Sequence, residues 1–127
     1  MRALLDTSFF VATESGRPLG EMEGVTETEV SVVTLAELTV GVLTANDDHR
    51  PARVATLSAV ESTWDPLPVD AEVARQFARI VAALRARGRR APVLDALVAA
   101  TAVVEQIPVV TQDNDYQFIP GVEVIRV

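Results

Sequence analysis

The stretch Leu4-Leu5-Asp6-Thr7-Ser8 joins an apolar segment of strand length to a helix-like segment, and it places a carboxylate where the two meet. We predict that Arg2 to Leu5 forms the first strand and that a short helix begins at about Ser8. A carboxylate at the end of an apolar strand is expensive to bury unless it reaches solvent, a hydrogen-bond donor or a cation. Taken alone, Asp6 is explained equally well as the N-cap of the following helix and as a ligand.

The same alternation of strand-length apolar segments and longer helix-like segments continues along the chain, which is typical of βαβ units in an α/β fold with a mainly parallel sheet. The predicted strands after the first are Val30 to Val33, Pro108 to Thr111 and Val122 to Val127, with Trp64 to Val69 as a short edge strand. The predicted helices are Leu35 to about Thr44, Pro51 to Val60, a helix capped by Asp70 and stopped by Gly88, and a helix from Pro92 to about Glu105. The polar stretch from Glu14 to Glu29 is predicted to be a surface connection or a short helix.

The length of 127 residues and the 49% hydrophobic content predict a single domain over residues 1–127. The longest uncharged runs have nine residues, which is too short for a membrane span. The N-terminal segment lacks the features of a secretory signal, so cytoplasmic residence is expected. The chain has no Cys and one His, so we expect a bound metal to be held mainly by oxygen atoms.

Four further acids also lie beside apolar segments, and each has a simple structural explanation. Glu37 completes a Thr34-Leu35-Ala36-Glu37 pattern that fits a capping box. Asp95 lies in a first helical turn, where the helix dipole favours an acid. Asp113 and Asp115 follow the strand that ends at Thr111, in a sequence typical of turns.

The acids beside these apolar segments are stronger evidence for a functional site when they are considered together. Parallel strands bring their carboxyl ends to one edge of the sheet, where ligands bind in open α/β folds. Carboxylates that gather there repel one another, so the site is expected to need a cation. Oxygen ligands favour hard cations such as Mg²⁺ or Mn²⁺.

The order LLDTS, TLAEL, PVLDALVAATA and VVTQDNDY resembles a PIN domain, specifically a VapC-type toxin, over essentially the whole chain. The resemblance implies a three-layer α/β/α sandwich with a Mg²⁺ or Mn²⁺ site that cleaves RNA. It assigns catalytic roles to Asp6, Glu37, Asp95 and Asp113, and it assigns metal binding to Asp6, Asp95, Asp113 and Asp115. Many relatives carry Asn at the position of Asp113, so Asp113 and Asp115 are alternatives for the direct ligand. The Ser8 and Thr111 hydroxyls match supporting positions that orient ligands or water, with local backbone capping as the alternative.

The implied function is that of the toxin of a type II toxin–antitoxin pair, an endoribonuclease held inactive by a cognate VapB-type antitoxin. A homodimer is also implied, with the antitoxin's C-terminal segment across the acidic groove. Two other functions fit the same acids. A phosphoacceptor receiver domain would need a Lys near the site, and the chain has none. A catalytically silent PIN-like binding module would not need all of the acids.

The formal net charge of −7 argues against a nucleic-acid partner, but cations bound to the acids would cancel much of it. The one dense basic cluster surrounds Gly88 and consists of Arg85, Arg87, Arg89 and Arg90. It is explained either as a solvated helix end or as a contact with the RNA backbone. His49 is expected at the surface near a helix start.

Overall fold

The computed structural model describes all residues from Met1 to Val127 and contains one sheet of four parallel strands in the order β2-β1-β3-β4. The strands are β1 (Arg2–Leu5), β2 (Glu27–Glu29), β3 (Val109–Thr111) and β4 (Val124–Arg126). In β1, Leu4 pairs with Glu29 of β2 and with Val109 of β3. Because all four strands run in the same direction, their carboxyl ends share one edge of the sheet.

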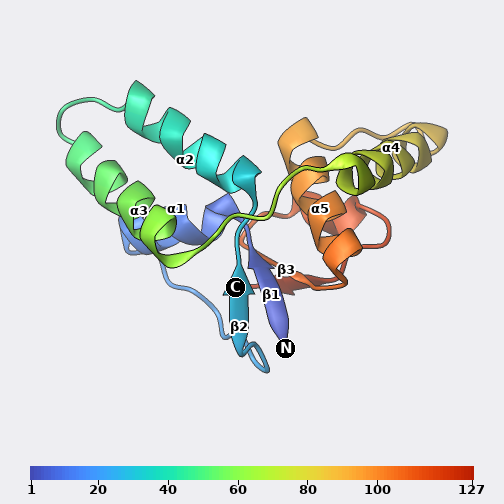
Figure 1. The fold of residues 1–127 in the computed structure, drawn as a ribbon, viewed down its shortest axis with the longest axis horizontal. Helices are drawn as coiled ribbons and strands as arrows, with labels where there is room; N and C mark the ends of the chain where they lie inside the picture. The colour runs from blue at the N-terminus through green and yellow to red at the C-terminus, as the bar shows by residue number, and fades with distance from the viewer.

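Five helices and one short 3₁₀ turn surround this sheet (Figure 1). Figure 1 shows α2 and α3 as an antiparallel pair on one side and α4 and α5 on the other. The bounds are α1 (Thr7–Ser15), α2 (Val32–Thr44), α3 (Arg50–Thr63), α4 (Ala71–Ala86), α5 (Val93–Glu105) and the 3₁₀ turn η1 (Asp115–Phe118).

The central strand β1 has apolar side chains buried on both of its faces. Leu4 belongs to the cluster that packs against α4 and α5, whereas Ala3 and Leu5 belong to a second cluster with Phe10 of α1. Successive residues of a strand point to opposite faces of a sheet, so the two clusters are two separate core layers. The α/β/α sandwich is therefore confirmed.

The predicted strand Val30 to Val33 is wrong, because the second strand lies just upstream, within the segment predicted to be a polar connection. The Ser31 Oγ accepts a hydrogen bond from the Val33 backbone N–H at 3.0 Å and caps α2, so the helix begins at Val32 rather than at Leu35. The β-branched run that suggested a strand instead leads into α2, whose first turn is buried at Val33 and Thr34.

The predicted edge strand Trp64 to Val69 is reduced to one bridge between Ser31 and Leu67. Pro66 and Pro68 flank Leu67 and have no N–H to donate to a ladder, which explains why pairing stops there.

The remaining elements agree with the sequence. Asp70 caps α4 through a hydrogen bond from the Val73 N–H at 2.9 Å, and Gly88 follows the helix with a φ of +66°. The helix predicted at Pro51 to Val60 is longer, from Arg50 to Thr63. Helix α5, β3 and β4 lie where they were predicted. None of the helices is both long and apolar enough to cross a membrane.

Candidate active site

The site begins where the two central strands end. Leu5 of β1 pairs with Val110 of β3, so the next residues, Asp6 and Thr111, lie side by side at the carboxyl edge of the sheet. The Thr111 hydroxyl donates to Asp6 Oδ2 at 2.9 Å. Asp6 also serves as the N-cap of α1. The capping explanation for Asp6 is thus correct, but it accounts for only part of what surrounds the carboxylate.

Asp6 is only 3% exposed, and three hydroxyl groups surround its carboxylate. The hydroxyls of Ser8 and Thr111 each donate to Oδ2 at 2.9 Å, and the Tyr116 hydroxyl donates to Oδ1 at 2.9 Å. We call these three groups the hydroxyl cage. The cage supplies the hydrogen bonds that burial of a charged group requires, and it fixes the orientation of the carboxylate.

Three other carboxylates lie outside the cage and form a tight group. Asp95 projects from the first turn of α5, Asp113 follows β3, and Asp115 begins η1. Each offers a carboxylate oxygen within 4.8 Å of the other two. We call them the outer acids. All three ion pairs in the protein use Arg2 or Arg50, so no basic side chain neutralises the outer acids.

This uncompensated negative charge changes the protonation of the site. Burial raises the pKa of Asp95 to about 7, and the nearby charges of Asp6, Asp113, Glu37 and Asp115 add to the effect. An acid with such a pKa is half-protonated near neutral pH unless a cation stabilises its ionised form. Perturbation of this size is more common at functional sites than elsewhere.

Glu37 faces the same site from the neighbouring helix α2. The Thr7 hydroxyl donates to Glu37 Oε1 at 2.7 Å. Burial raises the pKa of Glu37 and the Asp6 charge raises it further, against the opposing effect of the hydrogen bond from Thr7. The capping-box alternative is wrong, because the N-cap of α2 is Ser31 and Glu37 lies beyond the first helical turn.

The sequence reasoning missed two residues of this site, Tyr116 and Thr7. Tyr116 is fully buried, and its hydroxyl donates to Asp6 and makes a longer contact of 3.4 Å with Asp95 Oδ1. Burial and the surrounding acids raise the pKa of Tyr116, so the phenol stays protonated and remains a donor. The signal was the position of the only tyrosine directly after three polar turn residues.

The structure does not place the arginine cluster among the acids. Arg85, Arg89 and Arg90 line a pocket between α4 and α5, and Arg87 is the C-cap residue of α4. His49 is exposed at the start of α3, where its Nδ1 contacts the Asn46 Oδ1, so its expected surface position is confirmed.

Comparisons with known proteins agree with this geometry. The PIN domain family model matches residues 3–121. Ribonuclease VapC5 of Mycobacterium tuberculosis is 47% identical over 98% of this chain and 94% of its own length, and ribonuclease VapC4 of the same organism is 42% identical over 99% and 97%. The crystal structure of VapBC-5 from M. tuberculosis, a member of the VapBC family of toxin–antitoxin systems, has a TM-score of 0.89 and 42% identity, with 99% of this chain and 98% of that chain covered.

Proposed function

Because this chain belongs to the PIN-domain family and to the VapC ribonucleases within it, we propose that it is a toxin endoribonuclease whose outer acids, with Asp6 and Glu37, cleave RNA with a divalent cation. The observation that carries the proposal is the group of three unneutralised carboxylates beside a fourth, buried one.

The donor set fits a hard divalent cation. Asp95, Asp113 and Asp115 offer only carboxylate oxygens, which suit Mg²⁺ or Mn²⁺. Burial raises the pKa of Asp95 and the neighbouring acids raise it further, and a bound cation would offset both effects on the ionised carboxylate. The outer acids would hold the cation directly, with Asp6 as a fourth ligand. The bound cation would activate a water molecule and neutralise charge on the phosphate.

The protein's own residues have separate tasks in this mechanism. The hydroxyl cage keeps the Asp6 carboxylate in one orientation, so no reorganisation is needed when substrate arrives. Glu37 is held at Oε1 by Thr7, which leaves Oε2 free to accept a proton from the attacking water. Its raised pKa makes it a better base than an exposed glutamate. Asp95, whose pKa is raised to about 7, would have to lose its proton to hold a cation, so cation binding would depend on pH.

The VapBC-5 structure belongs to a family of toxin–antitoxin systems, and we extend that arrangement to this chain. A cognate VapB-type antitoxin would hold the enzyme inactive by covering the acidic groove. We further propose a homodimer and, because RNA is the substrate, action in the cytoplasm. Exposed apolar residues on α2, among them Leu43 at 75% exposure, offer surface for such contacts.

The test is cleavage of a mixed-sequence RNA pool by protein freed of antitoxin, in Mg²⁺, in Mn²⁺ and in EDTA. We expect cleavage with either metal, none in EDTA, and severe loss in Asp6→Asn and Asp95→Asn. Asp65→Asn is the matched control, because Asp65 is an exposed acid outside the site. Cleavage that persists in EDTA would refute the metal mechanism, whereas RNA binding without cleavage under all conditions would indicate a silent binding module.

A further inference from the structure

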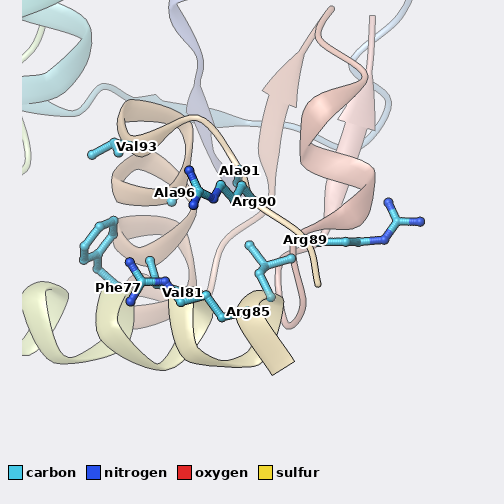
Figure 2. A pocket seen from close by; sticks show the side chains of 9 residues that line it. Phe77, Val81, Arg85, Arg89, Arg90, Ala91, Val93 and Ala96 are labelled. Atoms are coloured by element: carbon cyan, nitrogen blue, oxygen red, sulfur yellow. The ribbon is translucent and has the colours of Figure 1, made fainter. Parts of the chain in front are cut away.

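A pocket of about 290 Å³ lies between α4 and the start of α5 (Figure 2), and none of the outer acids lines it. Phe77 and Val81 of α4 line it together with Val93 and Ala96 of α5. Val93 and Ala96 flank Asp95 in the first turn of α5, so the pocket and Asp95 share this turn, and their side chains project from it in different directions.

Two arginines at this pocket have no partner. Figure 2 shows the guanidinium groups of Arg85 and Arg90 on the same side of the pocket, near Phe77 and Val93. Neither forms an ion pair or a side-chain hydrogen bond with the protein. Two cations over an apolar cavity that no carboxylate lines have the chemistry to bind an anion with an apolar part.

Arg89 has a different role from its two neighbours. In Figure 2 its side chain points away from the other two guanidinium groups. Its guanidinium carbon lies 4.6 Å from the centre of the Phe118 ring, in a cation–π contact with η1. Arg89 therefore links the α4–α5 loop to the turn that carries Asp115, and it leaves Arg85 and Arg90 as the free pair.

We propose that this pocket seats one nucleotide of the RNA substrate next to the cleaved bond, with its phosphate on Arg85 and Arg90 and its base against Phe77 and Val93. The inference rests on the proposed ribonuclease function and adds a substrate-binding subsite to it. A volume near the lower end for small-molecule sites suits a single nucleotide. An RNA strand that passes over this turn of α5 would place one nucleotide in the pocket and a neighbouring one at Asp95.

Charge complementarity favours RNA as the occupant. The chain carries a net charge of −7 and presents its outer acids to the substrate, so a flanking phosphate needs a local source of positive charge. A guanidinium pair can bind one phosphate with several charge-assisted hydrogen bonds, and a flat ring or apolar wall can take a base without regard to its identity.

The experiment compares Arg85→Gln/Arg90→Gln with Arg75→Gln/Arg79→Gln, which removes the same charge from exposed positions of the same helix outside the pocket. Binding of a fluorescent mixed-sequence RNA is measured against salt with Ca²⁺ in place of Mg²⁺, and cleavage kinetics are measured in Mg²⁺. We expect the pocket pair to raise KM on the order of tenfold with little change in kcat. The slope of log K for RNA binding against log salt concentration should become less steep in both variants. The decrease should be larger by about 0.7 in the pocket pair than in the control pair.

Phe77→Leu keeps an apolar side chain and removes the flat ring, so it tests the base contact with little damage to packing. We expect RNA affinity to fall on the order of tenfold with an unchanged salt slope. In competition assays, uridine and adenosine 5′-monophosphates should displace RNA from the wild type at lower concentration than ribose 5-phosphate does.

Several results would overturn the inference. They are an absence of RNA binding by the wild type, equal losses in the pocket pair and the control pair, or equal competition by ribose 5-phosphate. Unchanged RNA binding with a weakened antitoxin complex would assign the pocket to the antitoxin instead. Failure of the proposed function looks different, because the wild type would then bind RNA in the assay but leave it uncut in Mg²⁺.

Discussion

The buried carboxylate of Asp6 and the outer acids lie at the same edge of the sheet, yet their surroundings are opposite. Asp6 receives hydrogen bonds from the three hydroxyls of the cage and is almost inaccessible to solvent. The outer acids face one another and have no cationic partner. The pKa of Asp95 is raised to about 7 by its burial and by the nearby acids. Without a bound cation, the folded protein therefore disfavours the ionised form of Asp95.

The contrast separates two uses of one residue type. A carboxylate that is satisfied by the fold contributes order to the site, and its removal leaves buried donors without an acceptor. A carboxylate that repels its neighbours costs stability and is retained for what it binds. Substitutions in the two regions should therefore affect stability and activity in different proportions.

The largest expected effect on activity is in the outer region. Asp95→Asn should lower kcat by about a thousandfold or more, because the proposed mechanism uses Asp95 as a ligand of the cation. In EDTA the same variant should be at least as stable as the wild type, because like-charge repulsion is removed. Cleavage assays and thermal denaturation of the same preparations provide both numbers. A strongly destabilised Asp95→Asn would show that Asp95 belongs with Asp6 as a structural acid.

The second effect concerns the buried region. Asp6→Asn places an amide, which is itself a donor on one side, among three hydroxyl donors. We expect a loss of about 2 kcal/mol in the free energy of unfolding together with loss of cleavage. Urea denaturation in EDTA measures the first quantity without any contribution from metal. An unfolding free energy equal to that of the wild type would contradict the idea that the cage stabilises the fold.

A smaller effect is expected for Tyr116→Phe, which removes one hydroxyl and keeps the buried ring. Asp6 Oδ1 loses its donor at 2.9 Å, so stability should fall by about 1 kcal/mol. Cleavage should fall on the order of tenfold, as for other groups that orient a metal ligand. Phe118→Leu is the matched control, because it alters the same 3₁₀ turn without contact to Asp6. Equal losses in the two variants would indicate a general effect on η1.

The smallest effect is a pH dependence of stability without metal. The folded-state pKa of Asp95 lies above its unfolded value, so its protonated form stabilises the fold at low pH and that contribution is lost as pH rises towards about 7. In EDTA, the melting temperature of the wild type relative to Asp95→Asn should fall between pH 5.5 and pH 8, on the order of 3 °C. Added Mg²⁺ should reverse the trend, because it favours the ionised form. A constant difference across this range would contradict the raised pKa.

Much of the fold follows from the sequence, because local signals and tertiary packing agree. Asp70 and Gly88 bound α4 as expected, and Pro92 precedes α5. The second strand was misplaced because three of the four residues from Val30 to Val33 are valine, which is typical of a strand. The Ser31 cap and burial against the sheet override that local preference, since propensity is weaker than tertiary context.

Asp6 and Asp113 were predicted from their positions just after strands, and Glu37 and Asp95 from their positions in helices, but the division of the acids into two regions could not be predicted. The hydrogen bond between Tyr116 and Asp6 joins residues 110 positions apart, and no local sequence pattern predicts it. Likewise, the four arginines form one cluster in the sequence, whereas the fold directs Arg89 to Phe118 and leaves Arg85 and Arg90 over the pocket. Contacts of this kind depend on how helices and turns pack.

The distance along the chain between Asp6 and Tyr116 also has a consequence during protein synthesis. The strand β1, which ends just before Asp6, leaves the ribosome early, but the cage is incomplete until Thr111 and Tyr116 have emerged and β3 has added to the sheet. Long-range parallel pairing is also slow to form. A growing polypeptide therefore has no assembled centre with which to cut the messenger RNA that encodes it, and the newly made protein acquires its activity only after translation has passed these residues.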